Sequence, residues 1–295
     1  MNTTPCCERA LAKMAVRALY FEVKAYPKPG LVSFVDAGAH HDMNGDTFYR
    51  SLFTLRHYFY HITKKGLVTR SFEELKHIAI EAEERMLKKT WGVNTHRGAI
   101  FALGIACVSV IRLAQEKKCF TPADVHLQLL NDWPKHLQHH EGNPESHGAI
   151  VRRQYKVIDA RQMAIRGYDL IFHLLPDFIA LFIDTQSLDT ACLFAYVALL
   201  QNMDDTNILY KKGKPGLDYA KSKIRELSVK DSLPAQRQKA LEIHRLFSES
   251  GISPGGVADL IGLLLFLGQL FCQPLRNYYP RHQLIESNLP NSFKV

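Results

Sequence analysis

The chain has 295 residues, and 46% of them are hydrophobic, which is enough for a sizeable buried core and excludes a disordered protein. Its formal charge of +8 suits a polyanionic partner, whether nucleic acid, membrane surface or phosphorylated small molecule. The most apolar stretch, residues 260–272, is shorter than the roughly 20 residues that span a bilayer, and no signal-peptide pattern opens the chain. We therefore expect a cytoplasmic protein without a membrane partner.

Apolar residues recur mainly at three- and four-residue spacing, which is typical of helices, and alternating strand patterns are rare. Helix caps support this assignment, for example Ser71 with Glu74. The pattern predicts an all-α protein with helices over residues 5–25, 45–64, 71–89, 95–116, 121–130, 146–171, 187–201, 215–229, 234–250 and 254–272.

The gaps between these helices are short. The longest polar gap, from Asp132 to Ser146, lacks the length and low complexity of an interdomain linker. We therefore expect one helical domain over residues 1–280, followed by a polar tail over residues 281–295.

The first candidate segment connects the first two helices and runs from Pro27 to Asp42. Its prolines and glycines predict a rigid loop that can hold Lys28 against a ligand, although an ordinary loop with His40 or Asp42 as a cap explains the same residues. His41-Asp42 is also typical of HD-type metal phosphohydrolases. That alternative needs an upstream histidine, and no histidine precedes His40.

The second segment, Asn94-Thr95-His96-Arg97, opens an apolar helix. Asn94 or Thr95 is expected to cap it, so that free backbone N–H groups and Arg97 face an anion. A capped core helix with an exposed His96 is an equally good interpretation.

Two further segments precede predicted helices. Asp204-Asp205 offers hard oxygen ligands that suit Mg²⁺, with Lys211 nearby for phosphate, while a solvated helix end is the simpler interpretation. Ser253-Pro254-Gly255-Gly256 leads into the most apolar helix and can present backbone N–H groups to phosphate, or can serve helix packing alone.

Four histidines, His136, His139, His140 and His147, cluster around the long polar gap. His136 and His140 are four residues apart, but the cluster lacks the helical HExxH pattern of zinc sites, so we expect no metal there, and only His147 remains a candidate.

The order of these segments resembles the triphosphoribosyl-dephospho-coenzyme A synthases over about residues 10–270. One departure stands at Met163, where the family usually has a glutamate after Gly-x-Arg-Gly; the arginine is kept as Arg161. A second is Lys211, which replaces an arginine and loses its planar fork. The resemblance rests on residues 27–32, 38–40, 42–43, 47–48, 94–101, 205–207, 253–256 and 258–259.

This resemblance implies that the ribose 2′-hydroxyl of dephospho-coenzyme A attacks the anomeric carbon of ATP and releases adenine. It suggests that Asp42 and Asp205 hold Mg²⁺, that either acts as the base, and that His40 or His96 protonates adenine. Changing either aspartate to asparagine is expected to lower turnover without unfolding. The expected nucleotide contacts are Lys28, Asn94, Thr95, Arg97, Arg161, Lys211, Ser253, Gly255 and Gly256.

Two alternatives stay open. A nucleotide-binding regulator or adaptor that kept the fold and lost turnover is supported by Met163. A nucleic-acid binder rests on net charge alone, and the dispersed lysines and arginines disfavour it. Whether the chain forms a homo-oligomer is left open.

Overall fold

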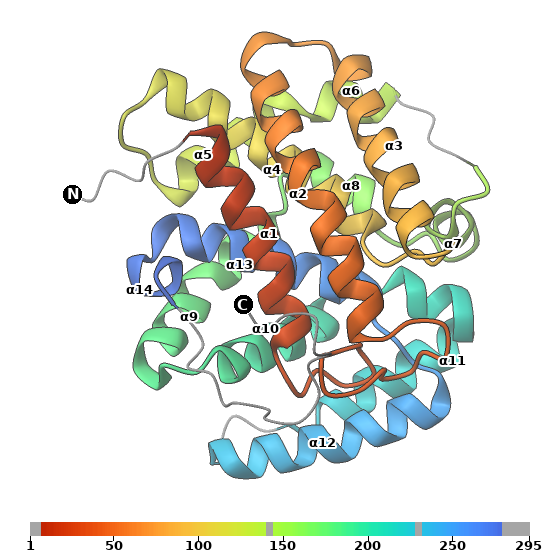
Figure 1. The fold of residues 1–295 in the computed structure, drawn as a ribbon. Helices are drawn as coiled ribbons and strands as arrows, with labels where there is room; N and C mark the ends of the chain where they lie inside the picture. The colour runs from red at the N-terminus through yellow and green to blue at the C-terminus, as the bar shows by residue number, and fades with distance from the viewer. Residues whose placement is uncertain (1–6, 140–143, 228–231, 279–295) are drawn as a thin grey trace, which may run out of the picture.

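The computed structural model describes residues 7–139, 144–227 and 232–278, and these residues form α-helices and no strands (Figure 1). The predicted all-α class is thus confirmed. The helices are α1 (Glu8–Lys24), α2 (Gly45–Val68), α3 (Phe72–Lys89), α4 (Arg97–Glu116), α5 (Pro122–Asp132), α6 (Pro134–His139), α7 (His147–Tyr155), α8 (Ala160–Ile165), α9 (Asp169–Thr185), α10 (Leu188–Asn202), α11 (Thr206–Ile224), α12 (Leu233–Ser250), α13 (Gly255–Phe271) and α14 (Gln273–Arg276).

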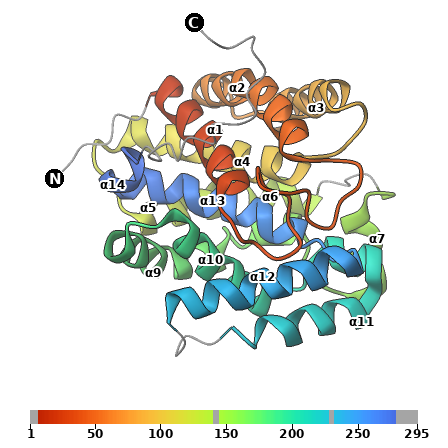
Figure 2. The same cartoon turned by 60° about the horizontal axis from the view of Figure 1, so that its bottom comes forward.

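The core is built around α13, which is apolar on nearly every side and therefore must be surrounded by protein. It packs against α1, α4, α9 and α10. In Figure 2 it crosses the middle of the molecule, with α1, α2 and α3 above it and α9 to α12 below. The buried apolar side chains form one cluster that runs from Leu11 to Leu275.

Helix α4 is the second core element. It is the one described helix long and apolar enough to cross a membrane, and 78% of its apolar window is buried inside the protein. Packing against α2, α5 and α13 accounts for this apolar composition.

Several predicted helix starts are confirmed by their caps. The Ser71 hydroxyl accepts the Glu74 N–H, and Thr121 and Asp124 cap α5 reciprocally. These are local contacts between residues three apart, which is why a sequence pattern can predict them.

The predicted helix over residues 146–171 is wrong in extent, because the structure has α7, α8 and the start of α9 there. Lys156 ends α7 with a φ of 57°, and Gly167 and Tyr168 separate α8 from α9 with φ values of 63° and 58°. Such left-handed backbone cannot continue a helix. Most of α9 and all of α6 were not predicted.

The predicted helix over residues 215–229 begins too late. Asp205 caps the start of α11, and the helix continues through a kink at Gly213, two residues before Pro215. The proline marks this kink and not the helix start. His140 and the predicted tail over residues 281–295 lie outside the described residues.

Candidate functional site

Asp205 joins the starts of two helices. Its Oδ1 accepts the N–H groups of Asn207 at 2.9 Å and Ile208 at 3.0 Å in α11, and its Oδ2 accepts the N–H of Val257 in α13 at 2.9 Å. Burial raises the pKa of this carboxyl to about 6, although these N–H groups and that of Gly256 oppose the shift. Asp205 is therefore a shared cap that fixes α11 against α13.

The glycines at the start of α13 permit this close approach. A Cβ at Gly256 would lie 2.9 Å from Oδ2 of Asp205, and one at Gly255 would lie 2.5 Å from Nδ2 of Asn207. The N–H groups of Gly256 and Val257 already meet Asp205, so this helix start has little left to offer a phosphate.

A second carboxyl, Asp259, connects α13 to α4. It faces the N–H of Ala99, and a Cβ at Gly98 would collide with it. Although the residue keeps some surface, its carboxyl group is enclosed, and the loss of water raises its pKa well above the ordinary value, helped by the charges of Glu22 and Asp205. The starts of α4, α11 and α13 are thus held together by two acidic side chains.

His40 lies beside this junction and contacts two of the predicted residues. Its Nε2 lies 2.8 Å from the Ser253 hydroxyl and its Nδ1 lies 3.3 Å from Oδ1 of Asp42. Because a carboxylate can only accept, the proton belongs on Nδ1, and Nε2 is left as the acceptor. Burial and the charge of Lys211 lower the pKa of His40, against the opposing effect of Asp42, so the ring is neutral near pH 7.

His96, at the start of α4, is more deeply buried. Its Nδ1 lies 2.7 Å from the Ser51 hydroxyl and 3.2 Å from that of Thr95, and Nε2 has no hydrogen-bond partner among the described residues. Burial lowers its pKa to about 3. The imidazole is thus neutral, which does not fit a proton donor, and its Nε2 is an enclosed polar atom without a hydrogen-bond partner among the described residues.

The other three residues of the segment that opens α4, Asn94, Thr95 and Arg97, make different contacts. Asn94 caps α4 by accepting the N–H of Arg97 at 3.1 Å, and the Thr95 hydroxyl donates inward to the sulfur of Met86 at 3.1 Å. The exposed Arg97 forms an ion pair with Glu83. Only Arg97 of these three presents a side chain to solvent that can attract an anion.

Lys211 and Arg97 bound a cationic edge of the site. Both lower the pKa of His147, after the effect of burial, and Lys211 also acts on His40. The His147 ring stacks on Tyr210, with centroids 3.6 Å apart. Lys211 forms no ion pair with a described side chain. The structure thus brings residues from α4, α7 and α11 together around one positive surface.

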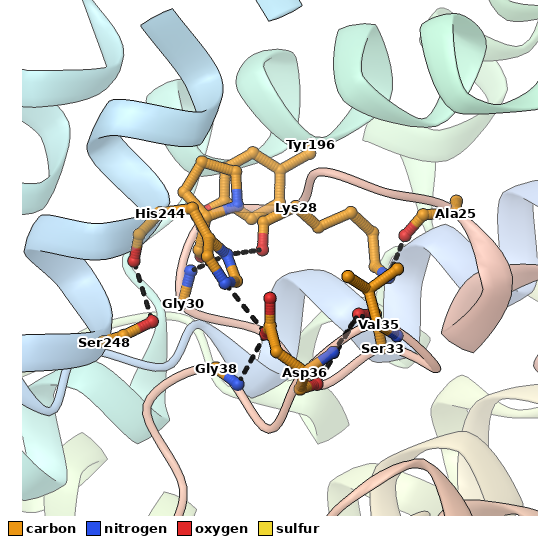
Figure 3. Close-up of polar contacts among 11 residues, drawn as sticks. Ala25, Lys28, Gly30, Ser33, Val35, Asp36, Gly38, Tyr196, His244 and Ser248 are labelled. Carbon is orange, nitrogen blue, oxygen red and sulfur yellow. Dashed lines mark hydrogen bonds and ion pairs between the residues drawn. The ribbon is translucent and has the colours of Figure 1, made fainter. Parts of the chain in front are cut away.

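Lys28 lies away from this edge. Its side chain is 1% exposed, and its ammonium donates to the carbonyls of Glu22 at 2.5 Å and Ala25 at 2.8 Å, with the Glu22 carboxylate 3.4 Å away. Figure 3 shows it extended toward Ala25. In this arrangement it stabilises the loop and does not reach a phosphate.

The loop that carries His40 is anchored by His244 of α12, which the sequence analysis missed (Figure 3). The N–H of Gly30 donates to Nδ1 of His244 at 3.2 Å, so Nε2 carries the proton and donates to Oδ1 of Asp36 at 2.9 Å. A lone histidine in an amphipathic helix gives no signal of a partner 208 residues away. Asp259 did give a signal, because an acid within the most apolar helix needs a buried partner.

Arg161 and Met163 lie in α8, which contacts α4. Met163 is partly buried and packs against the core. It lines a cavity together with Tyr168, and neither His40, Asp42 nor Ser253 is among the residues that line this cavity.

Magnesium does not fit the two aspartates proposed for it. Asp205 is buried and its oxygens are engaged by N–H groups, whereas the Asp42 side chain is 63% exposed and contacts His40. Within residues 7–139, 144–227 and 232–278, no three His, Cys, Asp or Glu side chains form a group that can hold a metal ion.

Comparisons with known proteins agree with the resemblance. A family model described as ATP:dephospho-CoA triphosphoribosyl transferase matches residues 8–276. Proteins named probable 2-(5''-triphosphoribosyl)-3'-dephosphocoenzyme-A synthase are similar, at 31% identity in Acinetobacter calcoaceticus over 86% of this chain and 88% of that protein, and at 34% in Stutzerimonas stutzeri over 90% and 93%. Protein CitXG of Haemophilus influenzae is 30% identical, over 84% of this chain and 57% of its own length. No solved structure matches.

Proposed function

Because the chain belongs to the ATP:dephospho-CoA triphosphoribosyl transferase family, we propose that it joins these substrates at the junction of α4, α11 and α13. A hydroxyl oxygen of dephospho-CoA forms a bond to the anomeric carbon of ATP, and the bond from that carbon to adenine breaks. The hydroxyl loses its proton. Adenine leaves with the electron pair of the broken bond and takes up a proton. The site must supply a base, a proton donor and cations.

The Asp42–His40–Ser253 chain of contacts is the observation that carries this proposal. Nε2 of His40 holds no proton in the tautomer that Asp42 selects, and it points to a hydroxyl 2.8 Å away. A substrate hydroxyl that takes the place of the Ser253 hydroxyl would be correctly placed to give up its proton to Nε2. His40 is therefore the proposed base, and Asp42 holds its ring.

The proton for adenine is better assigned to Asp259 than to His96. Burial keeps His96 neutral, with a pKa of about 3, whereas the raised pKa of Asp259 keeps this carboxyl protonated to a higher pH than an ordinary aspartate. His96 then contributes its unpartnered Nε2 as a hydrogen-bonding atom.

The triphosphate is expected at the cationic edge, on Lys211 and Arg97, with His147 beside them. Side chains are favoured over helix starts because Asp205 and Asp259 already occupy the N–H groups there. Arg161 remains a proposed nucleotide contact. Magnesium is proposed only as a counter-ion that ATP brings with it, near the exposed Asp42.

The family description favours the enzyme over a regulator or adaptor of the same fold. A cytoplasmic location and the absence of membrane and nucleic-acid partners stay predictions, and the oligomeric state stays open.

To test the function, purified protein is incubated with ATP, Mg²⁺ and dephospho-CoA, and mass spectrometry follows adenine and the joined product. We expect equal amounts of both, and neither when dephospho-CoA is omitted. If a folded sample binds ATP but yields neither adenine nor the joined product, the protein is not the transferase, and the nucleotide-binding regulator becomes the better hypothesis.

A further inference from the structure

The imidazole of His244 uses both of its ring nitrogens inside the protein. The residue lies in α12 and is 4% exposed. Its Nδ1 accepts the N–H of Gly30 at 3.2 Å, and its Nε2 donates to Oδ1 of Asp36 at 2.9 Å (Figure 3). One buried ring is therefore bonded to two separate points of the loop that connects α1 to α2.

Both of these points are in turn bonded to the residues that precede His40. The carbonyl of Gly30 accepts the N–H of Ala39 at 3.0 Å. The aspartate oxygen that meets the imidazole also accepts the N–H of Gly38 at 2.9 Å, as Figure 3 shows. Because His40 follows Ala39 directly, the ring of His244 holds the backbone of His40 through two short chains of hydrogen bonds.

Gly30 also connects this loop to the segment that carries Ser253. Its φ is 74°, and a Cβ there would collide with the carbonyl oxygen of Ile252, which directly precedes Ser253. The N–H of Ile252 donates to the carbonyl of Phe247 at 2.9 Å, at the end of α12. The helix that carries His244 therefore leads into the other half of the contact between His40 and Ser253.

We propose that His244 is a positioning residue for the transfer reaction and holds the base His40 where a substrate hydroxyl can reach it. This inference rests on the proposed function. The loop and the end of α12 meet at a separation that sets the distance of 2.8 Å between Nε2 of His40 and the Ser253 hydroxyl. Such precision matters, because a displacement of about 1 Å at a reacting group can lower a rate about a hundredfold.

The alternative is that His244 stabilises the fold and has no influence on the reaction. Its removal leaves the N–H of Gly30 without its acceptor, so a loss of stability is expected under both interpretations. The two differ in their dependence on His40. A residue that acts through His40 has no further effect on the rate once the His40 imidazole is absent.

His244→Ala is therefore measured in the parent protein and together with His40→Ala. In the parent, kcat for adenine release should fall about tenfold or more, and the KM for ATP should change less than about twofold, since the cationic edge lies on α4, α7 and α11. With His40→Ala present, His244→Ala should leave the remaining turnover within about twofold. An equal fall in both backgrounds, or an unchanged kcat in the parent, would overturn the proposal.

Ser109→Ala is the matched control for the loss of buried hydrogen bonds. This hydroxyl of α4 likewise donates one bond and accepts one, to Asp132 at 2.7 Å and from the indole N–H of Trp133 at 2.8 Å. The variant should lower the unfolding temperature and leave kcat unchanged. If it lowers kcat as much as His244→Ala does, loss of stability alone explains the effect and the proposal fails.

His244→Asn is the conservative variant and carries the same test if His244→Ala does not fold. Its amide oxygen lies near the position of Nδ1 and can accept the N–H of Gly30, whereas the shorter side chain does not reach Asp36. We expect a smaller fall in kcat than in His244→Ala, and again no further fall when His40→Ala is present. A fall of the same size in both backgrounds would contradict a role through His40.

A measurement that needs no turnover separates this proposal from the proposed function. Nitrogen NMR of the histidine rings reports which nitrogen of His40 carries the proton, and its signal is identified by its absence in His40→Ala. The Nδ1–H form should dominate in the parent. In His244→Ala we expect a mixture of both forms, because the ring is no longer held between Asp42 and Ser253, whereas Ser109→Ala should keep the parent signal.

The combined results decide between the two proposals. If the parent protein releases no adenine but the His40 ring changes in His244→Ala as expected, the positioning of His40 stands and the transferase reaction fails. If adenine is released and both kcat and the His40 signal stay at their parent values in His244→Ala, the positioning role is overturned and the transferase reaction stands.

Discussion

The buried and the exposed parts of the site each contain an aspartate and a lysine, but these residues differ in their contacts and in their access to solvent. Asp205 is enclosed and engaged by N–H groups from two helices, whereas Asp42 is largely exposed and contacts one histidine. Lys28 is likewise sealed between carbonyls, while Lys211 is exposed and free of ion pairs with described residues. Burial with satisfied contacts makes a charged side chain part of the scaffold, and exposure leaves it available to a substrate.

Asp205→Asn should break the scaffold and gives the largest expected effect. An asparagine would turn an NH₂ group toward N–H donors of α11 or α13, so we expect a loss of about 3 kcal/mol in the free energy of unfolding. Asp204→Asn is the control, because its ion pair with Lys221 is near the surface and worth about 0–1 kcal/mol. Denaturant unfolding of both variants measures the difference. Similar losses would mean that Asp205 is not a shared cap. The sequence analysis had expected Asp205→Asn to leave stability intact.

His40→Ala should remove the base and leave the scaffold in place. We expect turnover to fall about a hundredfold, with a much smaller change in the unfolding temperature. The neighbouring His41→Ala is the control, since that residue is exposed. Steady-state assays of adenine release give the comparison, and equal rates for the two variants would exclude His40 as the base.

Lys211→Met addresses the cationic edge and has the smallest expected effect. The KM for ATP should rise about tenfold, or about 1.4 kcal/mol, whereas Lys214→Met on the same helix should not change it.

The same variant should also shift the pH profile. Activity that needs neutral His40 increases with pH as this ring loses its proton. Because Lys211 lowers the pKa of His40, its removal should move that rise in kcat/KM to higher pH. If the rise in kcat/KM occurs at the same pH in the variant, Lys211 does not lower the pKa of His40.

The sequence predicted features that depend on residues close to each other along the chain. The caps at Ser71 and Thr121 and the long apolar helices α4 and α13 are of this kind. Left-handed backbone at Lys156 and Tyr168 was not predictable, because neither residue type favours that conformation, and the predicted helix over residues 146–171 therefore ran through both residues.

In the candidate site, the structure brings several of the predicted residues together, but it gives some of them structural contacts that the sequence analysis did not expect. His40 and Ser253 meet although 213 positions separate them, and the anchoring of the loop by His244 depends on a similarly distant contact. Whether an aspartate caps a helix or faces a substrate is decided by such tertiary contacts, which a single sequence does not contain.

Asp205 and Asp259 accept hydrogen bonds from N–H groups at the starts of α4, α11 and α13, and this has a consequence for the medium in which the protein works. These N–H groups are engaged before any substrate arrives, so attraction of a polyanion depends on side chains at the surface. Dissolved ions weaken such attraction, over a screening distance of about 8 Å at physiological ionic strength, and they hardly affect enclosed contacts. Ionic strength can therefore regulate how readily ATP is captured without disturbing the arrangement that receives it.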